Sequence, residues 1–104
     1  MKELRDKFRE FTEERDWEQF HTPENLAKSI SIEAAELLEC FQWSDVYEKE
    51  AVCEELADVV SYCVMMADRI DVDLKQIVLD KLEKNKEKYP VEKAKGIADK
   101  YDKL

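Results

Sequence analysis

The chain has 104 residues, a length that is most simply explained by a single domain over residues 1–104. Charged residues make up 41% of it and the formal net charge is −9, which argues against a nucleic acid or an anionic membrane surface as a partner. A nucleotide is compatible with this charge, because a bound metal ion can invert the local field. With one Gly and two Pro, the chain is expected to form helices joined by short connections.

The cysteines and the lack of long apolar stretches bear on where the protein is found. Cys40, Cys53 and Cys63 are odd in number and lack C-x-x-C spacing, so they are expected to be reduced and mostly buried thiols. No apolar run approaches the roughly 18 residues of a membrane span, and the N-terminus lacks a signal-peptide pattern. The sequence therefore predicts a soluble cytoplasmic protein.

Helical spacing of apolar residues predicts a first helix over residues 2–17, followed by a connection over residues 18–22. Thr22 and Pro23 then have the pattern of an N-cap and a proline at the first helical position. They predict a second helix over about residues 23–43. Its apolar stripe is expected to face the core: Leu26, Ile30, Ala34, Leu37 and Phe41.

Two more helices are expected in the second half of the chain. The third should run over about residues 46–70, with Ser44 or Asp45 as its cap. The fourth should run over about residues 74–89 and end before Pro90, because a proline disfavours helical backbone at the residue before it.

The charged tail over residues 91–104 is expected to be partly helical or disordered. The whole pattern predicts an all-α fold resembling a four-helix bundle. Helices this apolar on a chain this short suggest that one apolar face closes against a second copy of the chain.

Two of the expected helices carry acids where a plain core helix would carry none. Five acids lie in the otherwise apolar stretches 30–43 and 56–67 or directly beside them: Glu33, Glu36, Glu39, Glu55 and Asp58. Glu33 and Glu36 are three residues apart, and so are Glu55 and Asp58, so each pair shares a helix face. This pattern predicts four carboxylates at one seam between helices.

Such a seam requires compensation. Two carboxylates about 4 Å apart repel by roughly 4 kcal/mol at an effective dielectric constant near 20. The seam must therefore take up protons, admit water or bind a cation, and an all-carboxylate set suits Mg²⁺ first, with Mn²⁺ possible. Solvated helix positions are the alternative for the Glu residues, and Glu39 in particular could be an outer ligand, a base or a solvated residue.

Aromatic side chains are expected close to the acids. Trp43 lies seven residues after Glu36 and Tyr62 lies four after Asp58, so each shares a helix face with an acid, while Trp17 ends the first helix. These rings could stack on a base or a sugar. Ordinary packing in the core or at a helix end is the alternative.

The remaining polar candidates are less specific. His21 is the only histidine, which excludes a di-iron bundle with two Glu-x-x-His motifs and disfavours zinc catalysis. It could contact a ligand or simply cap a helix. Lys81 and Asn85 lie four residues apart in the expected fourth helix and could reach phosphates or a base, or could form a solvated basic face.

Four segments carry a resemblance to a known family: ERDWEQFHTPENL (14–26), EAAELLECFQW (33–43), EELADVVSYCV (54–64) and KLEKNKEKYP (81–90). Two of them hold the acid pattern, Glu33-x-x-Glu36 and Glu55-x-x-Asp58. On these segments the chain resembles the MazG-like all-α nucleotide pyrophosphohydrolases, in particular the dCTP pyrophosphatase branch.

The resemblance implies a homodimer or homotetramer whose active sites are built by more than one protomer. It implies Mg²⁺-dependent hydrolysis of (deoxy)nucleoside triphosphates to the monophosphate and pyrophosphate, with pyrimidine substrates such as dCTP or modified dCTP. Nucleotide-pool sanitation would be the cellular role. The implied metal ligands are Glu33, Glu36, Glu55 and Asp58, and Glu36 and Glu39 are the candidates for the general base.

The resemblance also implies a nucleoside pocket lined by Trp17, Glu18, Gln19, Phe20, His21, Trp43 and Tyr62. Asn85 would contact the base, and Lys81 could offset charge on the departing pyrophosphate. At Phe8 the animal members carry a base-contacting His, and a phenyl ring can stack but cannot donate a hydrogen bond. A helical oligomeric nucleotide-binding or regulatory module without hydrolytic activity is the alternative function.

Overall fold

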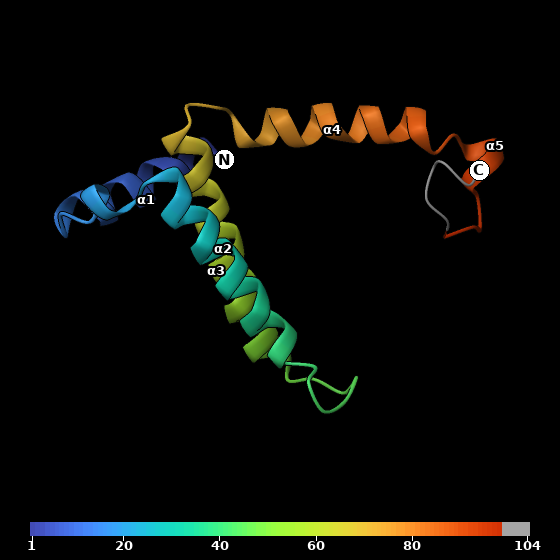
Figure 1. Cartoon of the computed structure of the whole chain (residues 1–104), viewed down its shortest axis with the longest axis horizontal. Coiled ribbons are helices and arrows are strands. Elements are labelled where there is room, and N and C mark those ends of the chain that lie inside the picture. The colour runs from blue at the N-terminus through green and yellow to red at the C-terminus, as the bar shows by residue number, and fades with distance from the viewer. Residues whose placement is uncertain (99–104) are drawn as a thin grey trace. The chain divides into compact units, whose positions relative to one another are not determined.

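The computed structural model describes residues 1–98, which are helical with no strand in this range. The chain divides into two compact units, Met1–Leu74 and Lys75–Leu104. The helical elements are shown in Figure 1: α1 (Lys2–Glu14), the 3₁₀ turn η1 (Glu18–Phe20), α2 (Pro23–Glu39), α3 (Lys49–Arg69), α4 (Leu74–Lys88) and α5 (Val91–Ala94). The expected all-α class is confirmed.

Helix α1 ends three residues earlier than predicted, because the chain reverses after Glu14. Asp16 takes a left-handed backbone conformation with φ of 52°. The Trp17 N–H donates to the Thr12 carbonyl over 3.0 Å, which closes the end of the helix. Trp17 therefore lies between α1 and η1 instead of completing the helix.

Helix α2 begins where the sequence predicts. The Thr22 hydroxyl oxygen accepts a hydrogen bond from the Asn25 N–H over 3.1 Å, and Pro23 occupies the first helical position. The Asn25 side-chain amide donates to the Phe20 carbonyl over 2.9 Å and so ties η1 to the start of α2.

The loop between α2 and α3 is longer than predicted, since α2 ends at Glu39 and α3 begins only at Lys49. The expected cap at Ser44 or Asp45 is wrong, because the N-cap residue is Glu48. The Ser44 hydroxyl instead accepts from the Val46 N–H over 3.0 Å, which makes a local turn of the kind that competes with helix.

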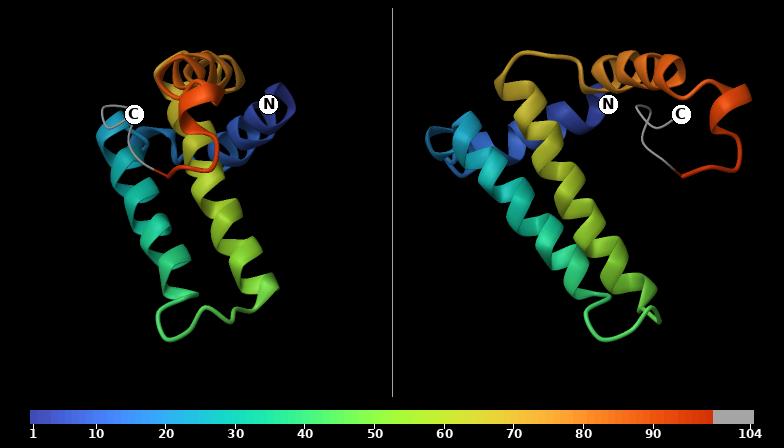
Figure 2. Two further views of the ribbon diagram at one scale, coloured as in Figure 1. Left: turned by 90° about the vertical axis from the view of Figure 1, so that its right-hand side faces the viewer. Right: turned by 45° about the vertical axis from the view of Figure 1, so that its right-hand side comes forward.

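Helices α2 and α3 lie side by side and antiparallel, and the loop over residues 40–48 joins them (Figure 2). Helix α1 packs on α3, where Arg9 forms an ion pair with Asp68. This arrangement places the acid-bearing faces of α2 and α3 opposite each other.

The core of the described chain is small. Its buried side chains are Leu26, Val64, Ala67 and Thr12. Of the expected α2 stripe, Leu26 is buried and Ile30 and Leu37 are half-buried, whereas Ala34 and Phe41 are exposed. Much of the apolar surface of α2 is therefore uncovered in a single chain.

The three cysteines are free thiols. Cys53 is exposed, so the expectation of mostly buried thiols is wrong at that position, while Cys40 and Cys63 are half-buried. Among the helices of residues 1–98, none is long and apolar enough to cross a membrane.

The second unit contains most of α4 and all of α5. Helix α4 ends at Lys88, two residues before Pro90, and the Tyr89 N–H donates to the Asn85 carbonyl over 2.9 Å. The start of the predicted tail is helical over Val91–Ala94. Residues 99–104 of that tail lie outside the described part of the chain.

Candidate active site

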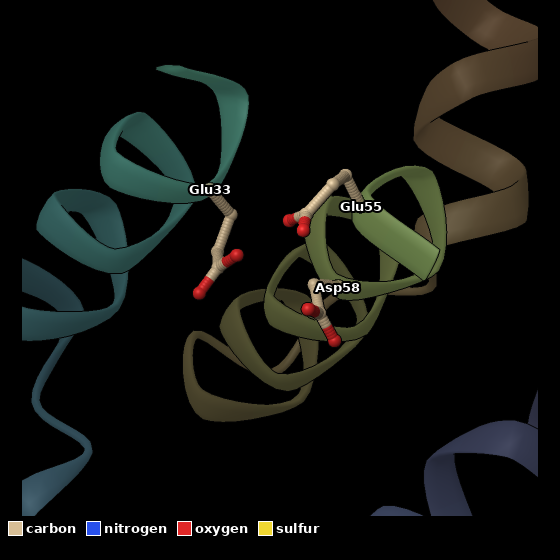
Figure 3. Close-up of side chains that lie close together, drawn as sticks. All are labelled: Glu33, Glu55 and Asp58. Carbon is tan, nitrogen blue, oxygen red and sulfur yellow. The ribbon is translucent and has the colours of Figure 1, made fainter. Parts of the chain in front are cut away.

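Three carboxylates from two helices converge in the first unit. Glu33 lies on α2, and Glu55 and Asp58 lie one turn apart on α3. Each offers an oxygen atom, and these three oxygens lie within 4.8 Å of one another. Figure 3 shows Glu33 and Glu55 extending toward each other from the two helices, with Asp58 beside Glu55. The three-residue spacing on α3 puts both of its acids on the face turned to α2.

The two glutamates of this cluster are uncompensated. The Oε2 atoms of Glu33 and Glu55 are buried and have no hydrogen-bond partner among the described residues. Within residues 1–98, no Lys or Arg forms an ion pair with Glu33, Glu55 or Asp58. Buried polar oxygens almost always have a partner, so two orphaned carboxylate oxygens at one point are suited to binding a cation or a proton.

Two carboxyl groups of the cluster, those of Glu33 and Glu55, have raised pKa values. Burial raises the pKa of Glu33, and the neighbouring carboxyl of Glu36 and the charges of Asp58 and Glu55 raise it further. Burial likewise raises the pKa of Glu55, again with Glu36 and Asp58 as nearby acids. Both carboxyls therefore hold protons more tightly than a solvated glutamate.

The fourth predicted ligand, Glu36, borders the cluster. It is half-buried on α2, one turn after Glu33, and its carboxyl acts on the pKa of both Glu33 and Glu55. It does not belong to the group of three oxygens that lie within 4.8 Å. Glu39 is exposed at the last residue of α2, further toward the loop.

A divalent metal ion fits this donor set. All the converging atoms are carboxylate oxygens, which are the ligands that Mg²⁺ and Mn²⁺ prefer. A cation would satisfy the two orphaned oxygens and remove the mutual repulsion of the acids. The same charge would attract a phosphate group to a seam that otherwise repels it.

The predicted aromatic residues are distributed along the first unit. Tyr62 is half-buried on α3, one turn after Asp58. Trp17 precedes η1 and contacts Phe11, with ring centroids 5.6 Å apart. Trp43 lies in the loop after α2 and is 89% exposed. Because α2 is 17 residues long, about 25 Å, the chain does not bring Trp17 and Trp43 together in one pocket.

The predicted residues around η1 have different roles. The Gln19 amide donates to the Asp16 carbonyl and carboxylate, so it stabilises the turn after α1. Phe20 is exposed. Glu18 and His21 line a cleft between α1, η1 and α3. Lys81 and Asn85 lie on α4 in the second unit, so their part in the site stays a prediction.

This cleft has a volume of about 300 Å³. Its walls include residues that the sequence analysis did not select: Arg5, Arg9, Thr12, Met65, Asp68 and Arg69. For Met65 and Arg69 a signal existed, because they continue the 3–4 spacing of Glu55, Asp58 and Tyr62 along α3. Nothing in the sequence joins Arg9 to Asp68, which are 59 residues apart.

The Arg9–Asp68 ion pair is part of the lining of the cleft. The Arg9 Nε–H donates to Asp68 Oδ2 over 2.8 Å, and its Nη2–H donates to Oδ1. This two-bond contact lowers the pKa of Asp68 and raises that of Arg9. Both groups are therefore charged at neutral pH.

The chain is similar to several characterised proteins. A model of the MazG-like family matches residues 28–104. The chain is 43% identical to dCTP pyrophosphatase 1 of Mus musculus and 40% identical to that of Homo sapiens, in both cases over all of this chain and 67% of the relative. A crystal structure of a pyrophosphatase from Archaeoglobus fulgidus superimposes with a TM-score of 0.81 at 45% identity, covering 86% of this chain and 92% of that one.

Proposed function

This chain belongs to the MazG-like family, and from that premise we propose that it hydrolyses deoxynucleoside triphosphates with the help of Mg²⁺, or alternatively Mn²⁺. Its enzyme class, nucleoside triphosphate pyrophosphohydrolase, follows from its similarity to the dCTP pyrophosphatases over the whole chain. The proposed substrates are pyrimidine deoxynucleotides such as dCTP or modified dCTP. The products are the monophosphate and pyrophosphate, and the proposed role is nucleotide-pool sanitation.

One structural observation supports the proposal most directly. Three carboxylate oxygens meet within 4.8 Å, and the buried Oε2 atoms of two of these residues have no hydrogen-bond partner in the described part of the chain. A triphosphate carries several negative charges and needs a cation to approach such a seam. Family membership and the donor set both support the proposal of a metal-dependent reaction at phosphorus.

We assign the metal to Glu33, Glu55 and Asp58, with Glu36 as a fourth ligand. When bound, the ion would neutralise the phosphates and make a water molecule more acidic. Glu36, or Glu39 one turn further along α2, would accept the proton of the attacking water. No side-chain nucleophile is required, because water attacks phosphorus directly.

The remaining predicted residues would hold the nucleotide. Tyr62, one turn after Asp58 on α3, would contact the sugar or the base. Glu18 and His21 line the cleft beyond it. Lys81 would offset charge on the pyrophosphate, and Asn85 would contact the base.

We further propose that the active form is a homodimer or homotetramer. A single described chain buries few apolar side chains, while Leu38 and Ile32 on α2 are 69% and 59% exposed. Trp17 and Trp43, both proposed to line the nucleoside pocket, lie at opposite ends of α2 within one chain. A second copy would cover the apolar surface and bring a partner's aromatic residue to the pocket.

Product analysis with the four standard dNTPs and modified pyrimidine dNTPs, each with and without Mg²⁺, tests the proposal. We expect monophosphate and pyrophosphate, formed only with the metal and fastest with a cytosine nucleotide. Release of single phosphate would contradict the proposed cleavage point. Tight nucleotide binding without any product would favour the non-hydrolytic binding module.

Two variants test whether the assigned residues form the active site. Glu36→Ala and Asp58→Ala should abolish turnover and leave the helical circular dichroism signal unchanged. Glu54→Ala is the matched control, because Glu54 is an exposed acid next to Glu55 that lies outside the cluster. Full activity in either site variant would refute the metal assignment.

A further inference from the structure

The cleft between α1, η1 and α3 is lined by both apolar and polar side chains. Phe8 on α1 and Val64 and Met65 on α3 are its apolar members. Its polar members include the Arg9–Asp68 ion pair, together with Arg5, Thr12, Glu13, Glu18, His21 and Arg69. A flat heteroaromatic ring needs this combination of an apolar face and hydrogen-bonding groups at its edge. The cleft volume of about 300 Å³ is at the small end of ligand pockets.

The cleft is also within reach of the acid cluster. Met65 and Arg69 follow Glu55 and Asp58 on the same stripe of α3. Met65 is seven residues beyond Asp58, which is about 10 Å along the helix axis. A nucleoside triphosphate with its phosphates at the acids can therefore extend its base along α3 into the cleft.

The ion pair has hydrogen-bonding capacity left at its outer edge. Its two internal bonds use the Arg9 Nε–H and one Nη2–H together with one lone pair on each Asp68 oxygen. Each carboxylate oxygen keeps a second lone pair, and the guanidinium keeps further N–H groups. The Arg9 and Asp68 side chains are 48% and 25% exposed, so this edge is accessible. The outer edge of the ion pair thus presents a hydrogen-bond acceptor directly beside hydrogen-bond donors.

We propose that the Arg9–Asp68 pair determines the base specificity of the enzyme by recognising cytosine. Asp68 would accept from the N4 amino group, and the adjacent Arg9 N–H groups would donate to the N3 and O2 acceptors. Thymine and uracil carry the O4 acceptor in place of the amino group, so their O4 would face the carboxylate and be repelled. This inference rests on the proposed function, since it concerns the substrate choice of the same reaction.

Arg9 and Asp68 do not stand out in the sequence, because they are 59 residues apart and lie on different helices. Phe8 can stack on a base but cannot form hydrogen bonds with it. Arg9, the next residue on α1, supplies the missing donors, and Asp68 on α3 holds them in a fixed orientation through two parallel bonds. Recognition is thus shared between two helices that meet only in the folded protein.

The test is the ratio of kcat/KM for dCTP to that for dUTP and dTTP in three proteins. Asp68→Asn places a donor where the carboxylate was, and we expect the preference for dCTP to fall by about 10- to 100-fold, the discrimination that one bidentate contact supplies. Asp6→Asn is the matched control, because Asp6 forms an exposed ion pair with Arg9 Nη1 over 4.0 Å but does not line the cleft. It should leave the ratio unchanged.

A charge-swapped variant separates recognition from a purely structural role. Arg9→Asp combined with Asp68→Arg keeps an ion pair between α1 and α3 but reverses the order of donor and acceptor. If the pair only holds the helices together, this variant will retain the native ratio and Asp68→Asn will slow all dNTPs equally. Either result would overturn the proposal, whereas a shift toward dUTP and dTTP in both variants supports it.

Failure of the proposed function would look different. The native protein would then release no pyrophosphate from any dNTP, with or without Mg²⁺. Base recognition would be measured in that case by calorimetry with dCMP and dTMP. A native preference for dCMP that Asp68→Asn removes would support the role of the pair, and equal binding of both nucleotides would refute it.

Discussion

At the scale of single residues, the unusual feature is a pair of acids, Glu33 and Glu55, whose buried Oε2 atoms have no hydrogen-bond partner within residues 1–98. Burial raises the pKa of both carboxyls, and the nearby carboxyl of Glu36 raises it further. Such a cluster destabilises the metal-free fold at neutral pH, which is the usual sign that a site is arranged for a ligand and not for stability.

Neutralising one of these acids separates stability from function. We expect Glu55→Gln to raise the melting temperature measured without metal, because it removes a charge from the cluster. The same change should lower turnover by more than the roughly 10- to 100-fold that loss of an outer-shell group costs a metal site. Differential scanning calorimetry and the pyrophosphate assay measure the two effects. Glu54→Gln removes a charge that raises the pKa of Glu55 only weakly, from an exposed position outside the cluster, so both effects should be much smaller.

The pKa shifts also predict opposite pH responses with and without metal. The folded pKa values of Glu33 and Glu55 lie above their unfolded values, so their contribution to stability is complete below about pH 4.3 and is lost as the pH rises through the folded values. Metal binds the ionised carboxylates, so stabilisation by Mg²⁺ should grow over the same range. Melting temperatures between pH 5 and 8, with Mg²⁺ and with a chelator, test this. Equal Mg²⁺ stabilisation at every pH would contradict it.

Asp68 should have the opposite effect on the pH dependence of stability, and at a lower pH. Its pKa is lowered by the hydrogen bonds from Arg9, so its contribution is present above the unfolded value of about 3.9 and is lost as the pH falls through the folded value. Acid unfolding monitored by circular dichroism should therefore begin at a higher pH in Asp68→Asn than in the native protein. Asp6→Asn, on the exposed side of Arg9, provides the comparison.

At the scale of elements, helix ends decide where the site residues lie. The cap at Thr22 starts α2 at Pro23 and so sets the turn from which Glu33 faces α3. Glu33 lies eleven residues after the cap, so one residue of slippage would rotate it by about 100° away from Glu55. The start of α2 is thus part of the geometry of the acid cluster.

Removing this cap should weaken the fold measurably. We expect Thr22→Ala to lower the free energy of unfolding by about 1 kcal/mol, because the Asn25 N–H loses its acceptor. Thr22→Ser keeps the hydroxyl and should retain most of the stability. Urea titration followed by circular dichroism measures the difference. Equal stability of the two variants would show that the hydrogen bond contributes nothing.

At the scale of the whole molecule, many apolar side chains of the described residues are exposed, more than is usual for a stable monomer. Buried apolar residues are limited to Leu26, Val64 and Ala67 among those described, while Leu38, Ile32 and Leu56 are exposed. A core this small supplies little of the free energy needed to offset the conformational entropy of folding. Association of copies would supply the rest.

A charge in this surface should break the assembly. We expect light scattering after size-exclusion chromatography to give the mass of a dimer or tetramer for the native protein, and of a smaller species for Leu38→Glu. A buried acid without a partner costs far more than the same acid in water. Lys28→Glu, on an exposed polar position of α2, controls for the added charge and should keep the native mass. A monomeric native protein would refute the oligomer.

Much of the fold could be predicted from local patterns. The helical class, the start of α2 at Thr22 and Pro23, and the end of α4 before Pro90 all follow from capping and backbone rules that act over a few residues. The end of α1 could not, because Asp16 adopts a left-handed backbone conformation that residues other than glycine seldom take. The cap of α3 could not, because the Ser44 hydroxyl accepts from the Val46 N–H and so forms a turn before the helix. Those turns satisfy backbone groups that a longer helix would otherwise use.

The sequence by itself determined that the acids share helix faces within otherwise apolar runs, and from this pattern we predict a cation site. Tertiary structure alone decided which acids meet, since Glu33 contacts Glu55 and Asp58 only through the antiparallel pairing of α2 and α3. It alone joined Arg9 to Asp68 across 59 residues. The reason is physical: periodicity assigns a residue to a helix face, but only the packing of two helices decides which faces lie opposite each other.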